Sequence, residues 1–305
     1  MQVAVLMSTF NGEKYIGEQI NSILYQEDVT VDLYVRDDGS TDKTGEILRE
    51  YKERIKIILG DNIGVGASFM WLVYNVPMDY DYYAFSDQDD IWLSEKLLKA
   101  IKRIEAVEEI NTPILYGSNQ VLISAQGEVT GVRFEHTPNI SYKQIMCQNK
   151  ITGCTMVWNR QLQTFLKEEK RRPSTKLLYN RMHDVWVAMA AAAIGKIVYD
   201  DIGYIHYRQH ENNVVGVKKT NLLKQWMEKI LNPSIRNGRS ILCKEIYQCF
   251  NDLIYDCDMK RDLECYGFYN ESKESKNRLI HDRSLIQITG EHTLAFLMKV
   301  KLGLF

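Results

Sequence analysis

The chain has 305 residues, 45% of them hydrophobic and 26% charged, which is typical of a globular protein with one or two domains. Its formal net charge of -2 argues against the basic surface that nucleic-acid binding requires, so we expect no nucleic-acid partner. The six cysteines show neither CxxC spacing nor a His/Cys cluster, which indicates reduced thiols rather than a disulfide framework or a zinc site.

We expect no targeting signal in this sequence. The first apolar run stops at Ser8 and no basic segment precedes it, so it resembles a core strand more than a signal peptide. No apolar run reaches the roughly 18 residues that a transmembrane helix needs. We therefore expect a cytoplasmic protein, with peripheral contact at the inner face of the plasma membrane as an open alternative.

The first half of the chain alternates short apolar runs with amphipathic stretches, a pattern that predicts parallel strands joined by crossover helices. The predicted strands are Val3–Met7, Val31–Arg36, Ile55–Leu59 and Tyr82–Phe85, and the predicted helices are Tyr15–Tyr25, Lys43–Tyr51, Val65–Tyr74 and Leu93–Val107. This order predicts an α/β fold with a Rossmann-like, mostly parallel sheet flanked by helices. Ligands should bind beyond the carboxyl ends of the strands.

The second half is less regular. The predicted elements are a strand region at Ile114–Ser124, a polar loop to about Asn149, a strand at Ile151–Trp158, a helix at His183–Ile194 and short strands at Lys196–Tyr199 and Tyr204–Tyr207. From Lys218 onward the pattern is mostly helical. We therefore expect a catalytic domain over 1–217, with a nucleotide half over about 1–110 and an acceptor half over about 111–217. A helical carboxyl-terminal region should follow over 218–305.

The segment Asp87-Gln88-Asp89-Asp90 follows an apolar strand and is the most informative motif. Closely spaced carboxylates repel one another, so they stay ionised only where a cation, strong donors or water lie among them. In an extended segment Asp87 and Asp89 would face the same way and could share a hard cation such as Mg²⁺ or Mn²⁺. The alternative is an acidic loop that caps the helix near Leu93.

The turn Asp37-Asp38-Gly39-Ser40-Thr41-Asp42 follows the second strand. A strand-to-helix turn capped by Thr41 or Asp42 explains much of it. The two adjacent aspartates are not required by such a turn, and one could accept the N3–H of a pyrimidine base. The next loop, Asp61–Gly66, contains small residues but matches neither GxGxxG nor a P-loop, so a dehydrogenase or P-loop enzyme is poorly supported.

Two later segments carry weaker signals. Asp184, after His183, is either a helix cap or a general base for an acceptor hydroxyl. The segment Tyr207-Arg208-Gln209-His210 ends the last predicted strand, where His210 could complete a divalent-metal site and Arg208 could neutralise a diphosphate.

In order along the chain, these segments resemble the family 2 glycosyltransferases of fold type GT-A. The resemblance runs from residue 1 to about residue 216 through VAVLMSTFNGEKYIGEQINSIL, VRDDGSTDKT, DNIGVGASF, FSDQDDIW, ITGCTM and HDVW. FSDQDDIWL and YRQH followed by NNVVG are similar to the bacterial rhamnosyltransferases of cell-wall and capsular polysaccharide synthesis. The QxxRW motif of processive synthases is absent, which disfavours a processive polymerase.

The resemblance implies an inverting, metal-dependent enzyme that moves a sugar, L-rhamnose from dTDP-L-rhamnose, onto a glycan or lipid-linked acceptor. A UDP-hexose donor, or a nucleotide-sugar binding protein without turnover, are the alternatives. The implied roles are catalytic base for Asp184; donor nucleotide binding for Thr9, Asn11, Asp37, Asp38, Asn62, Gly64 and Asp87; Mn²⁺ or Mg²⁺ ligands for Asp89, His210 and Asp87; diphosphate contact for Arg208; and the acceptor side for Gly153, Cys154 and His183.

The carboxyl-terminal region has apolar residues at helical spacing with Lys and Arg between them, and it ends in the short basic run TLAFLMKVKLGLF. A helical appendage packed on the catalytic domain explains this pattern. A homodimer contact and a membrane-surface contact near a lipid-linked acceptor are the alternatives.

Overall fold

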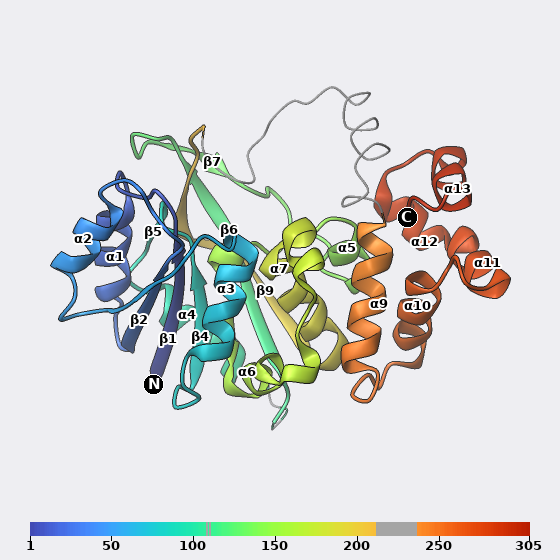
Figure 1. Cartoon of the computed structure of the whole chain (residues 1–305), viewed down its shortest axis with the longest axis horizontal. Coiled ribbons are helices and arrows are strands. Elements are labelled where there is room, and N and C mark those ends of the chain that lie inside the picture. Colours follow the sequence, from blue (N-terminus) through green and yellow to red (C-terminus); the bar gives the residue numbers. More distant parts are fainter. Residues whose placement is uncertain (108, 110, 212–236) are drawn as a thin grey trace. The chain divides into compact units, whose positions relative to one another are not determined.

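The computed structural model describes residues 1–107, 109, 111–211 and 237–305. These divide into two compact units (Figure 1). Unit 1 comprises Met1–Pro138, Ile151–Glu168 and Gly195–Gly216, and unit 2 comprises Asn139–Lys150, Glu169–Ile194 and Val217–Phe305. The domain boundary that we proposed at 217/218 lies outside the described residues. Two segments before it, 139–150 and 169–194, belong to unit 2.

Unit 1 is built on one mixed sheet, which within the described residues has nine strands in the order β3-β2-β1-β4-β8-β6-β9-β5, with β7 beside β6. The strands are β1 (Gln2–Thr9), β2 (Thr30–Asp37), β3 (Lys56–Leu59), β4 (Tyr82–Ser86), β5 (Ile91–Trp92), β6 (Ile114–Ile123), β7 (Val129–Val132), β8 (Val157–Asn159) and β9 (Lys196–Arg208). The pairs among β1 to β4 are parallel, β8 runs antiparallel to β4 and β6, and β9 is parallel to β6.

Helices cover both faces of this sheet, so the central strands are buried on both sides. The helices are α1 (Ile16–Leu24), α2 (Thr44–Glu50), α3 (Val65–Asn75), α4 (Lys96–Glu105) and α6 (Arg160–Lys167). Val5 and Met7 of β1 share one core with Ile20 of α1 and Ile101 of α4. On the other face, Phe85 lies 5.1 Å from Phe69 of α3 and 4.6 Å from Trp158, measured between ring centroids; Figure 1 shows α3 in front of the strands.

Unit 2 is helical in its described part. It contains α5 (Tyr142–Cys147), the short 3₁₀ turn η2 (Glu169–Arg171), α7 (Thr175–Ile194), α9 (Gly238–Phe250), α10 (Cys257–Gly267), α11 (Lys273–His281), α12 (Arg283–Thr289) and α13 (Thr293–Lys301). Trp186 of α7 packs against Phe250 of α9, and Phe305 packs against Phe296 of α13. No helix among the described residues is long and apolar enough to span a lipid bilayer.

Several local predictions were wrong. Ile151–Trp158 is not one strand, because the chain makes a 3₁₀ turn, η1 (Gly153–Thr155), before β8 begins at Val157. The two short strands predicted within 196–207 are the single strand β9. The polar loop predicted after Ser124, to about Asn149, contains β7 and α5. The helix predicted over His183–Ile194 is confirmed as the part of α7 that follows Met182, whose φ of 64° and ψ of 161° separate it from an earlier helical segment.

Candidate functional site

The predicted polar loops meet at one edge of the sheet in unit 1, because β2, β1 and β4 are parallel neighbours whose carboxyl ends lie together. The loop after β1 contacts the turn after β2 through Asn11, whose N–H donates to Ser40 Oγ (2.9 Å) and whose Oδ1 accepts from Thr41 N–H (2.9 Å). Asn11 has a φ of 50°, a left-handed conformation that asparagine tolerates better than most residues. The structure therefore brings Asn11 beside Asp37 and Asp38.

The two aspartates at the end of β2 have different partners. Asp37 Oδ1 accepts from the N–H (3.0 Å) and the hydroxyl (2.6 Å) of Ser40, which is the tight turn that we considered as an alternative. Asp38 is buried, pairs with Arg36, and accepts from the N–H groups of Ile63 (3.0 Å) and Gly64 (2.9 Å). Asp38 thus holds the loop that contains Asn62 and Gly64 against the end of β2.

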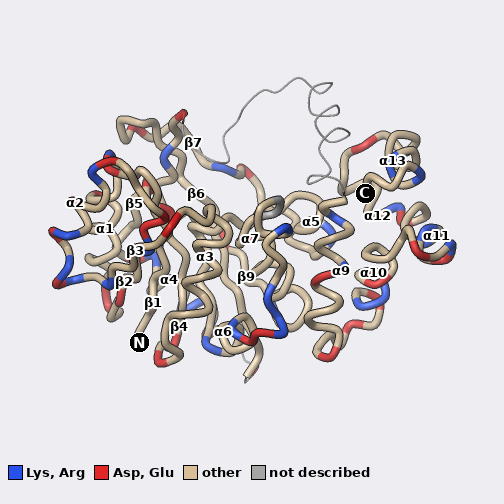
Figure 2. Tube along the Cα trace, in the orientation of Figure 1, with Lys and Arg blue, Asp and Glu red and all other residues tan. Residues whose placement is uncertain are grey.

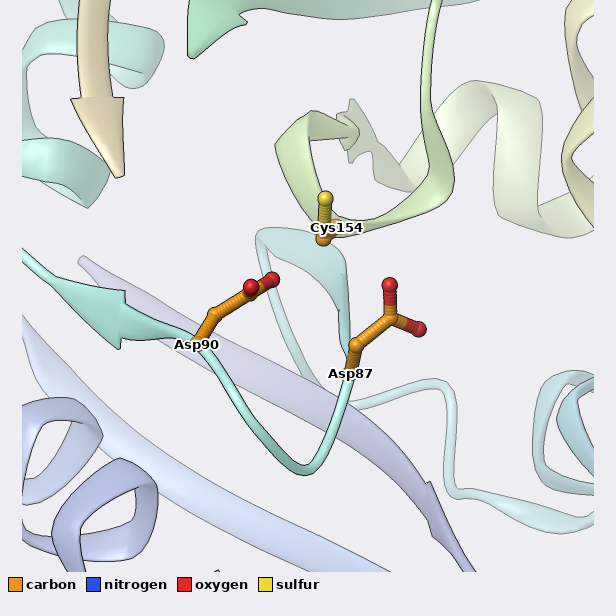
Figure 3. A group of neighbouring side chains, drawn as sticks. All are labelled: Asp87, Asp90 and Cys154. Atoms are coloured by element: carbon orange, nitrogen blue, oxygen red, sulfur yellow. The ribbon is translucent and has the colours of Figure 1, made fainter. Parts of the chain in front are cut away.

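Asp87 and Asp90 lie at the two ends of the turn that joins β4 to β5, and Cys154 of η1 lies across from them (Figure 3). One potential ligand atom from each of the three lies within 4.8 Å of the others. Figure 2 shows acidic positions gathered near the β5 label, among strands that carry few charges. Two carboxylates and a thiol form a donor set that a divalent cation can use.

Asp90 has an unfavourable electrostatic environment for a charged carboxylate. Its side chain is buried; Oδ1 accepts from Arg208 N–H (3.1 Å), while Oδ2 has no hydrogen-bond partner among the described residues. Burial, followed by the charges of Asp89 and Asp87, raises the pKa of Asp90 well above its usual value. Burial also raises the pKa of the Cys154 thiol. A bound cation would relieve both penalties, so these residues fit a divalent-metal site.

Asp89 points to a different partner. Its Oδ2 lies 2.7 Å from Nε2 of His210, and the ring of Tyr15 lies 5.3 Å from the His210 ring. The structure therefore joins two of the three predicted metal ligands, Asp89 and His210, and places the third, Asp87, with Asp90 and Cys154.

Arg208 is buried and bonded to protein groups. Its Nε donates to the carbonyl of Asp89 (3.0 Å), Nη1 to the carbonyl of Ala125 (3.3 Å) and Nη2 to Glu18 (2.6 Å). The bond to the Asp89 carbonyl holds the Asp87–Asp90 turn against Arg208 of β9. The diphosphate contact that we expected of Arg208 stays a prediction, and it would have to compete with these bonds.

Sequence reasoning missed a buried cation near this loop. Lys96 Nζ lies 3.5 Å from the centroid of the Trp92 ring and has no hydrogen-bond partner among the described residues. Burial lowers the pKa of Lys96 to about 7, against the opposing effect of Cys154 and Asp90. The signal was present, because Lys96 lies on the same helical stripe as the buried residues Ala100 and Ile104.

The remaining predicted residues lie in both units. Gly153 and Cys154 are buried in η1 of unit 1, while His183 and Asp184 follow the kink of α7 in unit 2. Asp184 accepts from Val185 N–H (2.8 Å) and from Asn149 Nδ2 (3.2 Å). Burial lowers the pKa of His183 to about 3, so its imidazole is neutral at physiological pH. Asp184 therefore lies in the first turn of the helix that follows Met182 and makes one local hydrogen bond there, and its catalytic role stays a prediction.

The Asp37–Asp42 turn and the Asp87–Asp90 loop thus lie at the carboxyl ends of parallel strands of one α/β sheet, the edge at which this class of fold binds its ligands. Residues 4–159 match the family model described as Glycosyl transferase family 2. The chain belongs to this family, which confirms the resemblance seen in the sequence.

Individual relatives are consistent with this assignment. The chain is 32% identical to the dTDP-rhamnosyl transferase RfbG of Shigella flexneri over 69% of this chain and 73% of that protein. It is 24% identical to the UDP-Glc:alpha-D-GlcNAc-diphosphoundecaprenol beta-1,3-glucosyltransferase WfaP of Escherichia coli, over 85% and 97% of the two chains. The crystal structure of S. aureus TarS 1-349 in complex with UDP-GlcNAc covers 99% of this chain and 88% of its own, with a TM-score of 0.59 and 16% identity. The predicted GT-A fold is confirmed.

Proposed function

We propose that this protein is an inverting glycosyltransferase that uses a nucleoside diphosphate sugar and a divalent metal ion in bacterial polysaccharide synthesis. The observation that carries the proposal is the position of the Asp87–Asp90 loop at the same sheet edge as the Asp37–Asp42 turn, with Asp87 and Asp90 facing Cys154 and with Asp89 Oδ2 2.7 Å from His210 Nε2. A carboxylate cluster next to a nucleotide loop suits a metal-bound sugar diphosphate.

For the donor we propose dTDP-L-rhamnose. Support comes from the similarity to the dTDP-rhamnosyl transferase of Shigella flexneri and from the form of the FSDQDDIWL segment. The similarity to a UDP-Glc-dependent relative supports a UDP-hexose as the second candidate. For the acceptor we propose a lipid-linked saccharide, since the name of that relative describes such an acceptor.

A panel of nucleotide sugars tests the donor. Thermal shift with Mn²⁺ should show the largest stabilisation with dTDP-L-rhamnose, and release of dTDP should accompany turnover with an acceptor extract. A larger shift with UDP-glucose, and UDP release, would assign the second donor. Binding without any nucleoside diphosphate release would instead indicate a binding protein without turnover.

In the proposed reaction, Thr9, Asn11, Asp37 and Asp38 line the nucleoside end, and Asp89 with His210 and Asp87 would hold Mn²⁺ or Mg²⁺. When bound, the metal offsets the charge that develops on the departing diphosphate. Asp184 would take the proton from an acceptor hydroxyl, which then attacks the anomeric carbon in a single displacement. Arg208 keeps Asp89 in place through its bond to the Asp89 carbonyl.

Asp184→Asn tests the proposed base. A positioned base contributes about 10²–10⁴-fold, so turnover should fall by that order while donor affinity, measured by calorimetry, stays close to that of the unaltered protein. Asparagine keeps an oxygen for Val185 N–H, so this local hydrogen bond survives. Unchanged turnover would remove Asp184 from the mechanism.

Asp89→Ala tests the metal site. The variant should lose Mn²⁺-dependent activation and bind the donor more weakly, because His210 loses its partner and the cation loses a ligand. Titration calorimetry with and without Mn²⁺ measures both effects, and a metal response equal to that of the unaltered protein would contradict the assignment.

We also propose peripheral contact between α13 and the inner face of the plasma membrane, with a homodimer as the alternative. Leu294, Met298 and Leu302 are each more than half exposed and follow one another at intervals of four residues, and Lys301 is exposed beside them. Replacing all three apolar residues by serine should abolish flotation of the full chain with anionic vesicles. Loss of a dimer in light scattering, without any flotation of the unaltered chain, would favour the homodimer.

A further inference from the structure

Gln88 lies between Asp87 and Asp89 in the Asp87–Asp90 turn, and its side chain is hydrogen-bonded to the loop after β1. Its Oε1 accepts from the hydroxyl of Thr9 (2.5 Å) and from Phe10 N–H (2.9 Å), while its Nε2 donates to the Phe10 carbonyl (3.2 Å). One side-chain amide therefore bonds both backbone groups of Phe10. Phe10 is 44% exposed, so this loop is accessible from solvent.

Gly12 leaves the space that this contact requires. A Cβ atom at Gly12 would lie 2.5 Å from Gln88 Oε1 and 2.9 Å from Thr9 Oγ1, closer than real Cβ contacts allow. Two of the clashing atoms belong to the flexible end of the Gln88 side chain, whereas Thr9 is buried and β-branched. An alanine at position 12 would therefore displace the Gln88 amide rather than Thr9.

The residues on either side of Gln88 in the Asp87–Asp90 turn are hydrogen-bonded to other elements. Gln19 of α1 donates to Ser86 Oγ (2.8 Å) and to the Asp87 carbonyl (3.2 Å), and Arg208 bonds the carbonyl of Asp89 and, through its N–H, the Asp90 carboxylate. The loop is thus supported on both sides of Gln88. Through the Gln88 amide, a change in the position of the Asp87–Asp90 turn is passed to Thr9 and Phe10.

We infer that Gln88 is a positioning residue that couples binding of a nucleoside at the loop after β1 to binding of a divalent cation at the Asp87–Asp90 turn. This inference rests on the proposed function. Coupling between two ligands is reciprocal, so an ordered cation site favours the nucleoside-binding conformation of residues 9–12, and a bound nucleoside tightens the cation site by the same factor. A phosphate bridge is not needed for this part of the coupling.

A nucleoside without phosphate removes the direct contact between a diphosphate and the cation. The comparison with Gln88→Ala then separates coupling through Gln88 from any contact that the nucleoside makes with Asp87. The probes are thymidine and uridine, each at a saturating concentration, and the measurement is the dissociation constant of Mn²⁺ from its electron paramagnetic resonance signal. We expect a nucleoside to tighten Mn²⁺ binding by about 5-fold or more in the unaltered chain. In Gln88→Ala and in Gly12→Ala this ratio should fall to about 1.

Gln163→Ala is the matched control. Gln163 of α6 is a buried glutamine of unit 1 with two hydrogen bonds, from Trp158 Nε1 (2.9 Å) and to the Val73 carbonyl (2.8 Å). Neither bond involves the Asp87–Asp90 turn or the loop after β1. This variant should lose stability and keep the nucleoside effect on Mn²⁺. An equal loss of coupling in Gln163→Ala would show that general loosening of unit 1, and not Gln88, is responsible.

Nucleoside diphosphates separate failure of this inference from failure of the proposed function. If neither dTDP nor UDP changes Mn²⁺ binding to the unaltered chain, the proposed function itself is wrong. If they do, but the nucleosides have no effect on the unaltered chain, or the same effect on Gln88→Ala and Gly12→Ala, the inference about Gln88 is overturned.

Discussion

Two carboxylates, the buried Asp90 of unit 1 and the partly buried Asp282 of unit 2, have opposite surroundings. Asp90 Oδ2 has no hydrogen-bond partner among the described residues, and burial with the charges of Asp89 and Asp87 raises its pKa. Burial would also raise the pKa of Asp282, but hydrogen bonds from Lys143, Ser284 and Tyr266 hold it well below its usual value. One carboxylate keeps an oxygen atom without a hydrogen-bond partner among the described residues, and the other accepts several hydrogen bonds.

The difference separates an acidic group that stabilises the fold from one that is suited to a ligand. Asp282 also caps α12 through Leu285 N–H (2.9 Å), and its partner Lys143 lies 3.2 Å from a second acid, Asp262. Folding therefore supplies every charge that this cluster needs. Asp90 is costly to bury as an anion, and a protein retains such a group where a bound cation compensates it.

Asp282→Asn should have the largest effect on stability. Asparagine can still cap α12, but it loses the ion pair with Lys143 and leaves that partly buried amine with less compensation. We expect a loss of about 2–4 kcal/mol in the free energy of unfolding, measured by urea titration. Asp256→Asn is the control, because Asp256 caps α10 through Asp258 and Met259 N–H and asparagine caps equally well. Equal losses in both variants would mean that the charge of Asp282 contributes nothing.

The buried His183 should have a smaller, pH-dependent effect on the stability of the folded protein. Burial lowers its pKa in the folded protein to about 3, while the unfolded chain takes up a proton near 6.5. The unfolded state therefore binds more protons between these values, so stability is full above about pH 6.5 and falls as the pH drops towards 3. At pH 5 the contribution lost is about 2 kcal/mol.

Urea titrations of His183→Gln between pH 7 and pH 4 test this effect. The variant should lose the part of the slope that belongs to His183, whatever its stability at pH 7. The exposed His281 on α11 provides the control, and His281→Gln should keep the slope of the unaltered chain. A slope that is unchanged in His183→Gln would show that the imidazole is accessible to protons in the folded state.

The sequence predicted those parts of the fold that follow from periodicity. Strands such as β1 and helices such as α1 were predicted because an apolar run, or apolar residues at helical spacing, reports burial directly. The strand expected at Ile151–Trp158 failed for a local reason. Thr155 donates its hydroxyl to the Thr152 carbonyl (2.8 Å) and Met156 N–H donates to Gly153 (2.9 Å), so side-chain and turn bonds replace the extended backbone. The left-handed Met182 in α7 has no sequence signal either.

The site was predictable in its location and less so in its pairings. The ends of parallel strands had to meet, so the loops containing Asn11, Asp38 and Asp87 were expected together. The pairing of Asp87 with Asp90 was not expected, because the argument assumed an extended segment and the chain turns there. The Gln88 contact with Phe10 depends on two loops 78 residues apart, and no local pattern encodes it.

Asp90→Asn should have the smallest effect on stability, and its sign is opposite to that of Asp282→Asn. The raised pKa of Asp90 means that its contribution to stability is present at low pH and is lost as the pH rises through the folded-state pKa. A neutral asparagine removes this loss, so without added metal at pH 7.5 the melting temperature should rise slightly, on the order of 2 °C. Mn²⁺ should stabilise the unaltered chain more than the variant, because in the variant the cation no longer has the negative charge of the Asp90 carboxylate beside it. Thermal melts of both chains, with and without Mn²⁺, measure the crossover. A variant that is less stable without metal, yet equally stabilised by Mn²⁺, would place Asp90 with Asp282 as a purely structural acid.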